Sequence, residues 1–214
     1  MKPMSSSLIV HHRDTLNRQP DICAPDPHQD TFSKTYFGFW MYLMTDCLLF
    51  ATIFCTYAVL HKSTFGGPSS HELFQLPTAF IETLILLLSS MTCGLSMLAA
   101  VKSQKKYVIG WLIITFCLGS SFLFLEIQEF SLLIREGNGF DRSAFLSSFF
   151  TLVGTHGLHI TFGLLWMIVM IAQVIYQGIT LSTFRRLALF SLFWHFLDLI
   201  WISIFTFVYL LGVA

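Results

Sequence analysis

The sequence predicts an all-α protein that crosses a membrane repeatedly, as a bundle of five transmembrane helices. Of its 214 residues, 55% are hydrophobic and 11% are charged. A soluble domain carries about 25% charged residues, roughly twice as many. Apolar runs long enough to cross a hydrocarbon core of about 30 Å recur five times along the chain. Little chain is left for a soluble domain.

The chain divides into a polar N-terminal tail and a transmembrane domain. Residues 1–35 contain four prolines and no apolar block, so we expect a mobile tail and not a cleavable signal peptide. Residues 36–214 form the domain. The predicted spans are 37–60, 77–101, 108–127, 144–176 and 187–212. The fourth is longer than a bilayer requires, which predicts tilt or an extension beyond the hydrocarbon.

Lysine and arginine residues predict the orientation. One side of the membrane would carry the tail and two loops, with Lys2, Arg13, Arg18, Lys34, Lys102, Lys105, Lys106, Arg185 and Arg186. The other side would carry only Lys62, Arg135 and Arg142. The positive-inside rule then places the N-terminus in the cytoplasm and the C-terminus in the periplasm. The formal net charge is zero, which argues against a nucleic-acid partner.

The first two spans each contain a carboxylate. Asp46 in the first is interpreted either as a neutral or hydrogen-bonded structural group or as part of a proton relay. Glu82 lies near the start of the second span, where it could sit at headgroup level. The face of Asp46 also carries Tyr42, Phe50, Ile53 and Tyr57, and the face of Glu82 carries Ser89, Cys93, Ser96 and Ala100. Small residues at this spacing predict that the second face is a helix interface.

The third and fourth spans contain paired polar residues. Glu126 and Glu129 lie one turn apart at the end of the third, where an interfacial position would solvate both carboxylates. His156 and His159 lie three residues apart in a glycine-rich part of the fourth. This pattern favours tight packing, with each imidazole satisfied by a carboxylate or carbonyl of another span. A metal site that uses these histidines stays open, since HxxH spacing also suits a metal ion.

The fifth span contains an imidazole and a carboxylate within an apolar run. Helical spacing predicts that Trp194, His195, Asp198 and Trp201 share one stripe, which should face protein because an ionisable residue at the bilayer centre costs about 2.5–3.5 kcal/mol. His156 and His159 are the candidate partners of this stripe.

With these residues placed, the chain resembles subunit III of the haem-copper respiratory oxidases, most closely the form found in cytochrome o ubiquinol oxidases. The resemblance is carried by Phe37–Asp46, Phe150–His159 and Trp194–Trp201, in that order and at matching spacing. The five predicted spans also fit the quinol-oxidase form, whereas typical cytochrome c oxidase versions have seven.

The resemblance implies a subunit that holds no haem, copper or other cofactor and packs beside the large subunit. It also implies that the large subunit holds haems and copper and that ubiquinol is the substrate of the complex. The expected partners of this chain are oxidase subunits I, II and IV and membrane phospholipids. Asp46 matches an intramembrane carboxyl that faces the large subunit in the family. Glu126 matches a position where many relatives have Gln, and Glu129 matches a carboxylate of the family.

Three functions are weighed. The preferred one is a non-catalytic subunit III of a proton-pumping ubiquinol oxidase in the bacterial inner membrane, supporting assembly, lipid seating and sustained turnover. The others are a proton-coupled transporter that uses Asp46, Glu82 and Asp198, and a membrane metalloenzyme that uses His156, His159 and His195.

We define the polar seam as the residues expected to contact each other, lipid or other subunits: Asp46, Glu82, Glu126, Glu129, His156, His159, Trp194, His195, Asp198 and Trp201.

Overall fold

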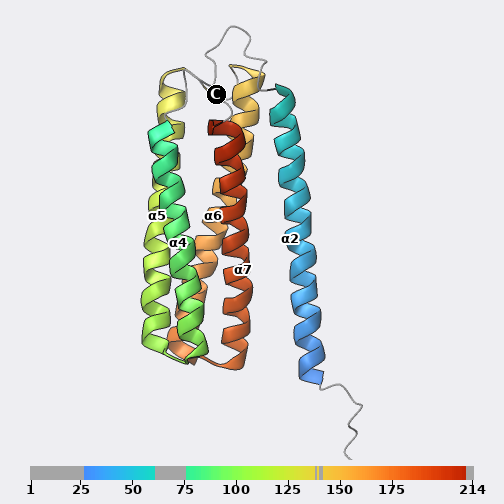
Figure 1. The fold of residues 1–214 in the computed structure, drawn as a ribbon, viewed down its shortest axis with the longest axis vertical. Coiled ribbons are helices and arrows are strands. Elements are labelled where there is room, and N and C mark those ends of the chain that lie inside the picture. The colour runs from blue at the N-terminus through green and yellow to red at the C-terminus, as the bar shows by residue number, and fades with distance from the viewer. Residues whose placement is uncertain (1–26, 61–75, 138, 140–141, 211–214) are drawn as a thin grey trace, which may run out of the picture. The chain divides into compact units, whose positions relative to one another are not determined.

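The computed structural model describes residues 27–60, 76–137, 139 and 142–210 (Figure 1). Within these residues every regular element is helical. The elements are α2 (Pro27–Leu60), α4 (Leu76–Val101), α5 (Lys105–Arg135), α6 (Ala144–Gln177), α7 (Leu181–Ile204) and the π-helix η1 (Phe205–Leu210). The predicted all-α class is confirmed.

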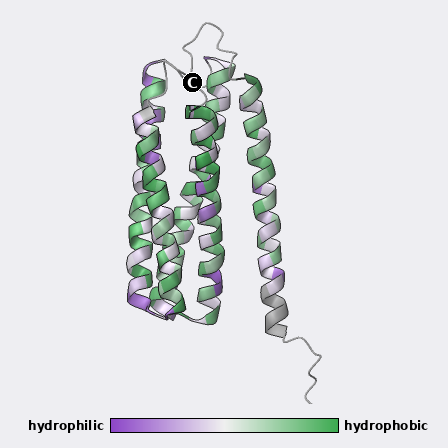
Figure 2. Cartoon of the chain, viewed as in Figure 1, coloured by the Kyte–Doolittle hydropathy of each residue, from purple (hydrophilic) through white to green (hydrophobic). Residues whose placement is uncertain are grey.

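Five helical segments are long and apolar enough to cross a membrane. They are Ser33–Leu60, Pro77–Val101, Lys105–Arg135, Ala144–Gln177 and Leu181–Leu210. Hydrophobic residues extend along the helices, and hydrophilic residues gather mainly at the turns (Figure 2). The predicted number of spans is confirmed, because a run of about 20 apolar residues is itself the physical requirement for crossing.

Several helix ends differ from the prediction. α2 begins at Pro27, inside the stretch expected to be a polar tail, whereas residues 1–26 lie outside the described residues. α5 continues to Arg135, eight residues beyond the predicted end at 127. The apolar residues Phe130, Leu132, Leu133 and Ile134 follow the two carboxylates and extend the helix by two turns. Polar side chains inside a span therefore did not mark its end.

Helices α4, α5, α6 and α7 form a four-helix bundle in which each helix packs against two others (Figure 1). The contacting pairs are α4 with α5, α5 with α6, α6 with α7, and α7 with α4. Trp201 lies opposite Thr83 and Trp194 lies opposite Ser89, so α4 and α7 are antiparallel. Large buried side chains, including Phe122, fill the centre of the bundle.

Two short turns lie at the same end of this bundle. In the α4–α5 turn, Ser103 has a φ of 53°, and its N–H donates to the carbonyl of Ala100 over 2.9 Å. In the α6–α7 turn, Gly178 has a φ of 72°, a backbone angle that favours glycine. Thr180 then caps α7 by accepting a hydrogen bond from the Thr183 N–H over 3.2 Å. Such turns connect antiparallel neighbours directly.

The chain divides into two compact units between Met41 and Tyr42. In the described part of the first unit, α2 is helical from Pro27, and the rings of Tyr36 and Trp40 make an edge contact with centroids 6.4 Å apart. The rest of α2 belongs to the second unit together with the four-helix bundle.

A candidate intramembrane polar site

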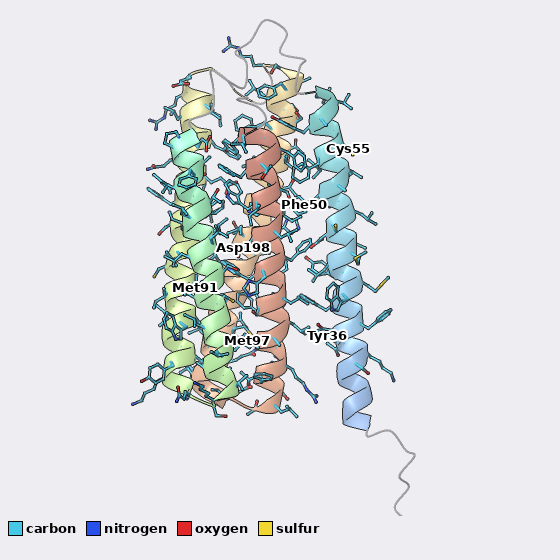
Figure 3. All side chains as sticks on the ribbon, in the orientation of Figure 1. Tyr36, Phe50, Cys55, Met91, Met97 and Asp198 are labelled. Carbon is cyan, nitrogen blue, oxygen red and sulfur yellow. The ribbon has the colours of Figure 1, made fainter. Side chains whose placement is uncertain are left out.

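The α7 stretch Trp194–Trp201 turns three of its four polar-seam residues into the bundle. Trp194, Asp198 and Trp201 are buried, and Asp198 is labelled in Figure 3. The indole N–H of Trp194 donates to Ser89 Oγ over 2.9 Å. The indole N–H of Trp201 donates to Thr83 Oγ1 over 3.2 Å. Both bonds join α7 to α4, so this stretch fixes one of the interfaces that close the bundle.

The prediction for His195 is wrong in two respects. Its side chain is exposed in this chain, and its Nδ1 is hydrogen-bonded with Ser90 Oγ of α4 over 2.5 Å, not with a histidine of α6. The reason is the helical angle: successive residues turn by about 100°, so His195 points about a quarter turn away from Trp194, while positions 198 and 201 return to the face of Trp194. Trp201 is the residue of this stretch that meets His156.

Two glycines make room for the indole of Trp194. A Cβ at Gly119 of α5 would lie 2.9 Å from Trp194 Cη2. A Cβ at Gly163 of α6 would lie 3.0 Å from Trp194 Cζ3. The ring therefore packs against bare backbone on two helices. This agrees with the prediction that the glycines of residues 154–163 favour tight packing.

His156 is fully buried among aromatic rings. It stacks on Trp201 with centroids 5.3 Å apart at an interplanar angle of 30°, and Phe122 meets it edge-on at 6.0 Å. Neither ring nitrogen has a hydrogen-bond partner within the described residues. The expectation that every imidazole of this pair would meet a carboxylate or carbonyl therefore fails at His156.

His159 meets that expectation. Its Nδ1 is hydrogen-bonded with the Thr155 carbonyl over 2.7 Å, and its Nε2 lies 3.8 Å from Asp46 Oδ2. Phe50, one turn after Asp46 on α2, packs on the His159 ring with centroids 5.3 Å apart. Asp46 also interacts with the hydroxyl of Tyr42. The carboxylate thus lies at the contact between α2 and α6.

The glutamates lie towards the end of the bundle opposite the α4–α5 and α6–α7 turns. Glu82 is fully buried, and the small residues on its face are buried too, which confirms the predicted interface. Glu126 is 3% exposed, and a Cβ at Gly157 would lie 2.9 Å from its Oε1. The expected interfacial, solvated position is therefore wrong for Glu126. Its side chain packs against the backbone of α6, because α5 continues past it.

Glu129 is half-buried and lies beside η1, the π-helix that follows α7. The Tyr209 hydroxyl, carried by η1, lies 3.4 Å from each Glu129 carboxylate oxygen. Glu126 interacts electrostatically with both Glu82 and Glu129. These three carboxylates therefore form one cluster, with Glu82 on α4 and the other two on α5. This cluster is separate from the contact of Asp46 with His159.

Sequence reasoning placed Ser89 on a helix interface without naming its partner, and it missed Thr83 and Ser90. Thr83, Ser89 and Ser90 supply the partners of Trp201, Trp194 and His195. A usable signal was present, because Ser89 follows Glu82 and Ser90 follows Thr83 by seven positions, which is about two helical turns in each case. Within the part of the chain that the structure describes, no three His, Cys, Asp or Glu side chains are placed to hold a metal ion.

Comparison with known proteins identifies the family. The family model described as "Cytochrome c oxidase subunit III" matches residues 26–213. The chain belongs to this family. Membership covers every described helix and agrees with the resemblance found in the sequence. It gives no support to a transporter or a membrane metalloenzyme.

Individual subunit III relatives are similar over most of their length. "Cytochrome bo(3) ubiquinol oxidase subunit 3" of Pseudomonas aeruginosa is 57% identical over 187 residues, 87% of this chain and 90% of the relative. The protein of the same name from Buchnera aphidicola subsp. Baizongia pistaciae is 49% identical over 184 residues, 86% and 94%. "Cytochrome c oxidase subunit 3" of Bacillus sp. strain PS3 is 41% identical over 206 residues, 96% and 100%.

Proposed function

We propose that this chain is subunit III of a cytochrome o type ubiquinol oxidase, a multi-pass protein of the bacterial inner membrane. The observation that carries the proposal is the 57% identity to a bo(3) ubiquinol oxidase subunit 3 over 90% of that relative. The cytochrome c oxidase subunit 3 relative is less similar, at 41%. Quinol oxidation and oxygen reduction then belong to the whole complex, within an aerobic respiratory chain.

In this proposal the chain is a non-catalytic partner of oxidase subunits I, II and IV. Haems and copper are held by the large subunit, ubiquinol is the substrate of the complex, and phospholipids contact the exposed apolar faces of the helices. The N-terminus lies in the cytoplasm and the C-terminus in the periplasm. The charge distribution supports this orientation.

The polar seam acts through structure and not through chemistry of its own. The bonds of Trp194 and Trp201 hold α7 to α4, and the contact of Asp46 with His159 holds α2 to α6. A polar group buried between spans is costly unless a neighbour receives it, so each pair favours one helix arrangement over others. The large subunit then meets a rigid surface, which supports assembly and sustained turnover.

Deletion of this chain tests the proposal. The remaining complex is purified with its haem content measured, and oxygen consumption with ubiquinol is followed from the first turnover until the rate falls. We expect a measurable initial rate that decays faster than in the whole complex, and recovery when the wild-type chain is supplied from a plasmid. A remaining complex with full haem content and no initial activity would contradict a non-catalytic role.

A further inference from the structure

One end of the four-helix bundle carries a concentration of positive charge. This end is formed by the α4–α5 and α6–α7 turns. We define the basic end as the five cationic residues there: Lys102, Lys105, Lys106, Arg185 and Arg186. All three lysines and Arg186 are exposed, and Arg185 is half-buried. The cations therefore reach the surface of the protein.

The helices that form this end supply no negative charge. The sequence has no Asp or Glu between Glu82 and Glu126, and none between Asp141 and Asp198. These two stretches contain both turns and the adjoining parts of α4 to α7. At the opposite end of the bundle, Glu136 directly follows Arg135 in the sequence. Excess positive charge is thus specific to one end.

Hydrogen bonds join one cation from the start of α5 and one from α7 to the C-terminal part of α6. Lys105 Nζ donates to the Ile175 carbonyl over 2.7 Å, and Arg186 Nη1 donates to Gln173 Oε1 over 3.2 Å. The ammonium groups of Lys102 and Lys106 make no ion pair or side-chain hydrogen bond with a described residue. The arrangement leaves two cations available beside two that are held by α6.

Exposed apolar and aromatic side chains lie at the same helix ends as these cations. Tyr107 is 63% exposed and Tyr176 is 88% exposed, and the neighbouring Val101, Ile175 and Leu181 are exposed as well. Tyrosine is enriched where a transmembrane helix meets the headgroup region. A surface that passes from aliphatic groups through tyrosines to cations matches a phospholipid with an anionic headgroup.

We propose that the basic end binds an anionic phospholipid, with its phosphate near Lys102 and Lys106 and its acyl chains along the exposed apolar surface of α5 and α6. Basic surfaces between transmembrane helices attract such headgroups, and each nearby Lys or Arg strengthens the attraction about fivefold. Orientation of the chain alone requires only an excess of positive charge. The proposal requires in addition that a particular lipid be selected.

A photoactivatable phosphatidylglycerol analogue, with its reactive group close to the glycerol, tests this in the assembled, purified complex. We expect labelling of peptides that contain Tyr107 or Tyr176, because these side chains adjoin the cations. Excess unlabelled phosphatidylglycerol should compete, and neither phosphatidylethanolamine nor inorganic phosphate should do so. Equal labelling by a phosphatidylethanolamine analogue, competition by inorganic phosphate, or no labelling of these peptides would each overturn the proposal.

Charge variants sharpen the test. Lys102→Gln combined with Lys106→Gln should raise the lipid concentration that gives half-maximal labelling by about 25-fold, the product of two fivefold effects. Arg135→Gln combined with Arg142→Gln removes the same charge at the opposite end and should leave labelling unchanged. Equal loss in both pairs, or no loss in the lysine pair, would refute the site. The inference rests only on membrane insertion, so its failure would leave the proposed oxidase role intact.

Discussion

The packing of Trp194 depends on two residues that have no side chain. Gly119 and Gly163 let α5 and α6 approach the indole so closely that a Cβ would lie 2.9 Å or 3.0 Å from a ring carbon, nearer than an ordinary contact of 3.4–4 Å. In a bilayer, lipid tails are as apolar as leucine, so close packing of this kind and hydrogen bonds, and not the exclusion of water, hold helices together. Single-atom changes at these positions should therefore be felt.

Gly163→Ala should destabilise the chain by about 1–3 kcal/mol, the usual cost of overpacking. Its new Cβ would lie 3.0 Å from Trp194 Cζ3 and 3.3 Å from Phe193 Cε1, and an indole ring cannot bend aside. Gly110→Ala is the control, because nothing lies within 4 Å of a Cβ there. The midpoint of unfolding in an SDS titration measures both. Equal midpoints for the two variants would show that the contact with Trp194 is unimportant.

At the scale of elements, α2 contacts the bundle with a narrow face. Leu43, Asp46, Phe50 and Tyr57 are its buried residues between Tyr42 and Leu60, and the remaining side chains there are exposed or half-buried. Phe50 is the largest of the apolar members and touches both His156 and His159. The association of this helix should depend on a few side chains.

Phe50→Ala should lower the free energy of unfolding by about 3 kcal/mol, the lower end of the range for a buried Phe, since the lost ring contacts are replaced by lipid and not by water. Leu48→Ala on the same helix is the control, with an expected change of about 0.5 kcal/mol or less, because Leu48 is 66% exposed. The same SDS titration compares them. A larger loss at Leu48 would mean that another subunit covers the opposite face of α2.

The elements also show what can be read from an amino-acid sequence. The five spans and the small-residue face of α4 were predictable, because length, apolarity and helical spacing are local properties. The end of α5 was not, because Glu126 looks interfacial until Gly157 of α6 is placed beside it. The partner of His195 was not, because the sequence does not state that α4, rather than α6, faces that side of α7. Contacts between spans depend on which helices are neighbours.

At the scale of the whole molecule, the order of the helices predicts which loops lie on the same side of the membrane. Gln104 in the α4–α5 turn and Gln177 at the end of α6 lie at one end, and Glu136 after α5 lies at the other. In a chain without its native cysteines, Gln104→Cys and Gln177→Cys should react with a membrane-impermeant maleimide from the same side. Glu136→Cys should react from the opposite side.

The charge distribution predicts which of the two sides is cytoplasmic. Inverted membrane vesicles expose the cytoplasmic face, so Gln104→Cys and Gln177→Cys should react there, and Glu136→Cys should react in spheroplasts. Opposite labelling of Gln104→Cys and Gln177→Cys would contradict the fold itself. Reversal of all three would preserve the fold and refute the predicted orientation.

The two short turns have a consequence for biogenesis. Each turn makes a hairpin of sequential neighbours, α4 with α5 and α6 with α7, that can enter the bilayer as one unit. The bonds of Trp194 with Ser89, Trp201 with Thr83 and His195 with Ser90 all join one hairpin to the other. We therefore expect closure of the bundle to be a second event, separate from insertion. A chain that has lost these bonds would still be fully inserted and helical, yet unable to present a finished surface to its partners.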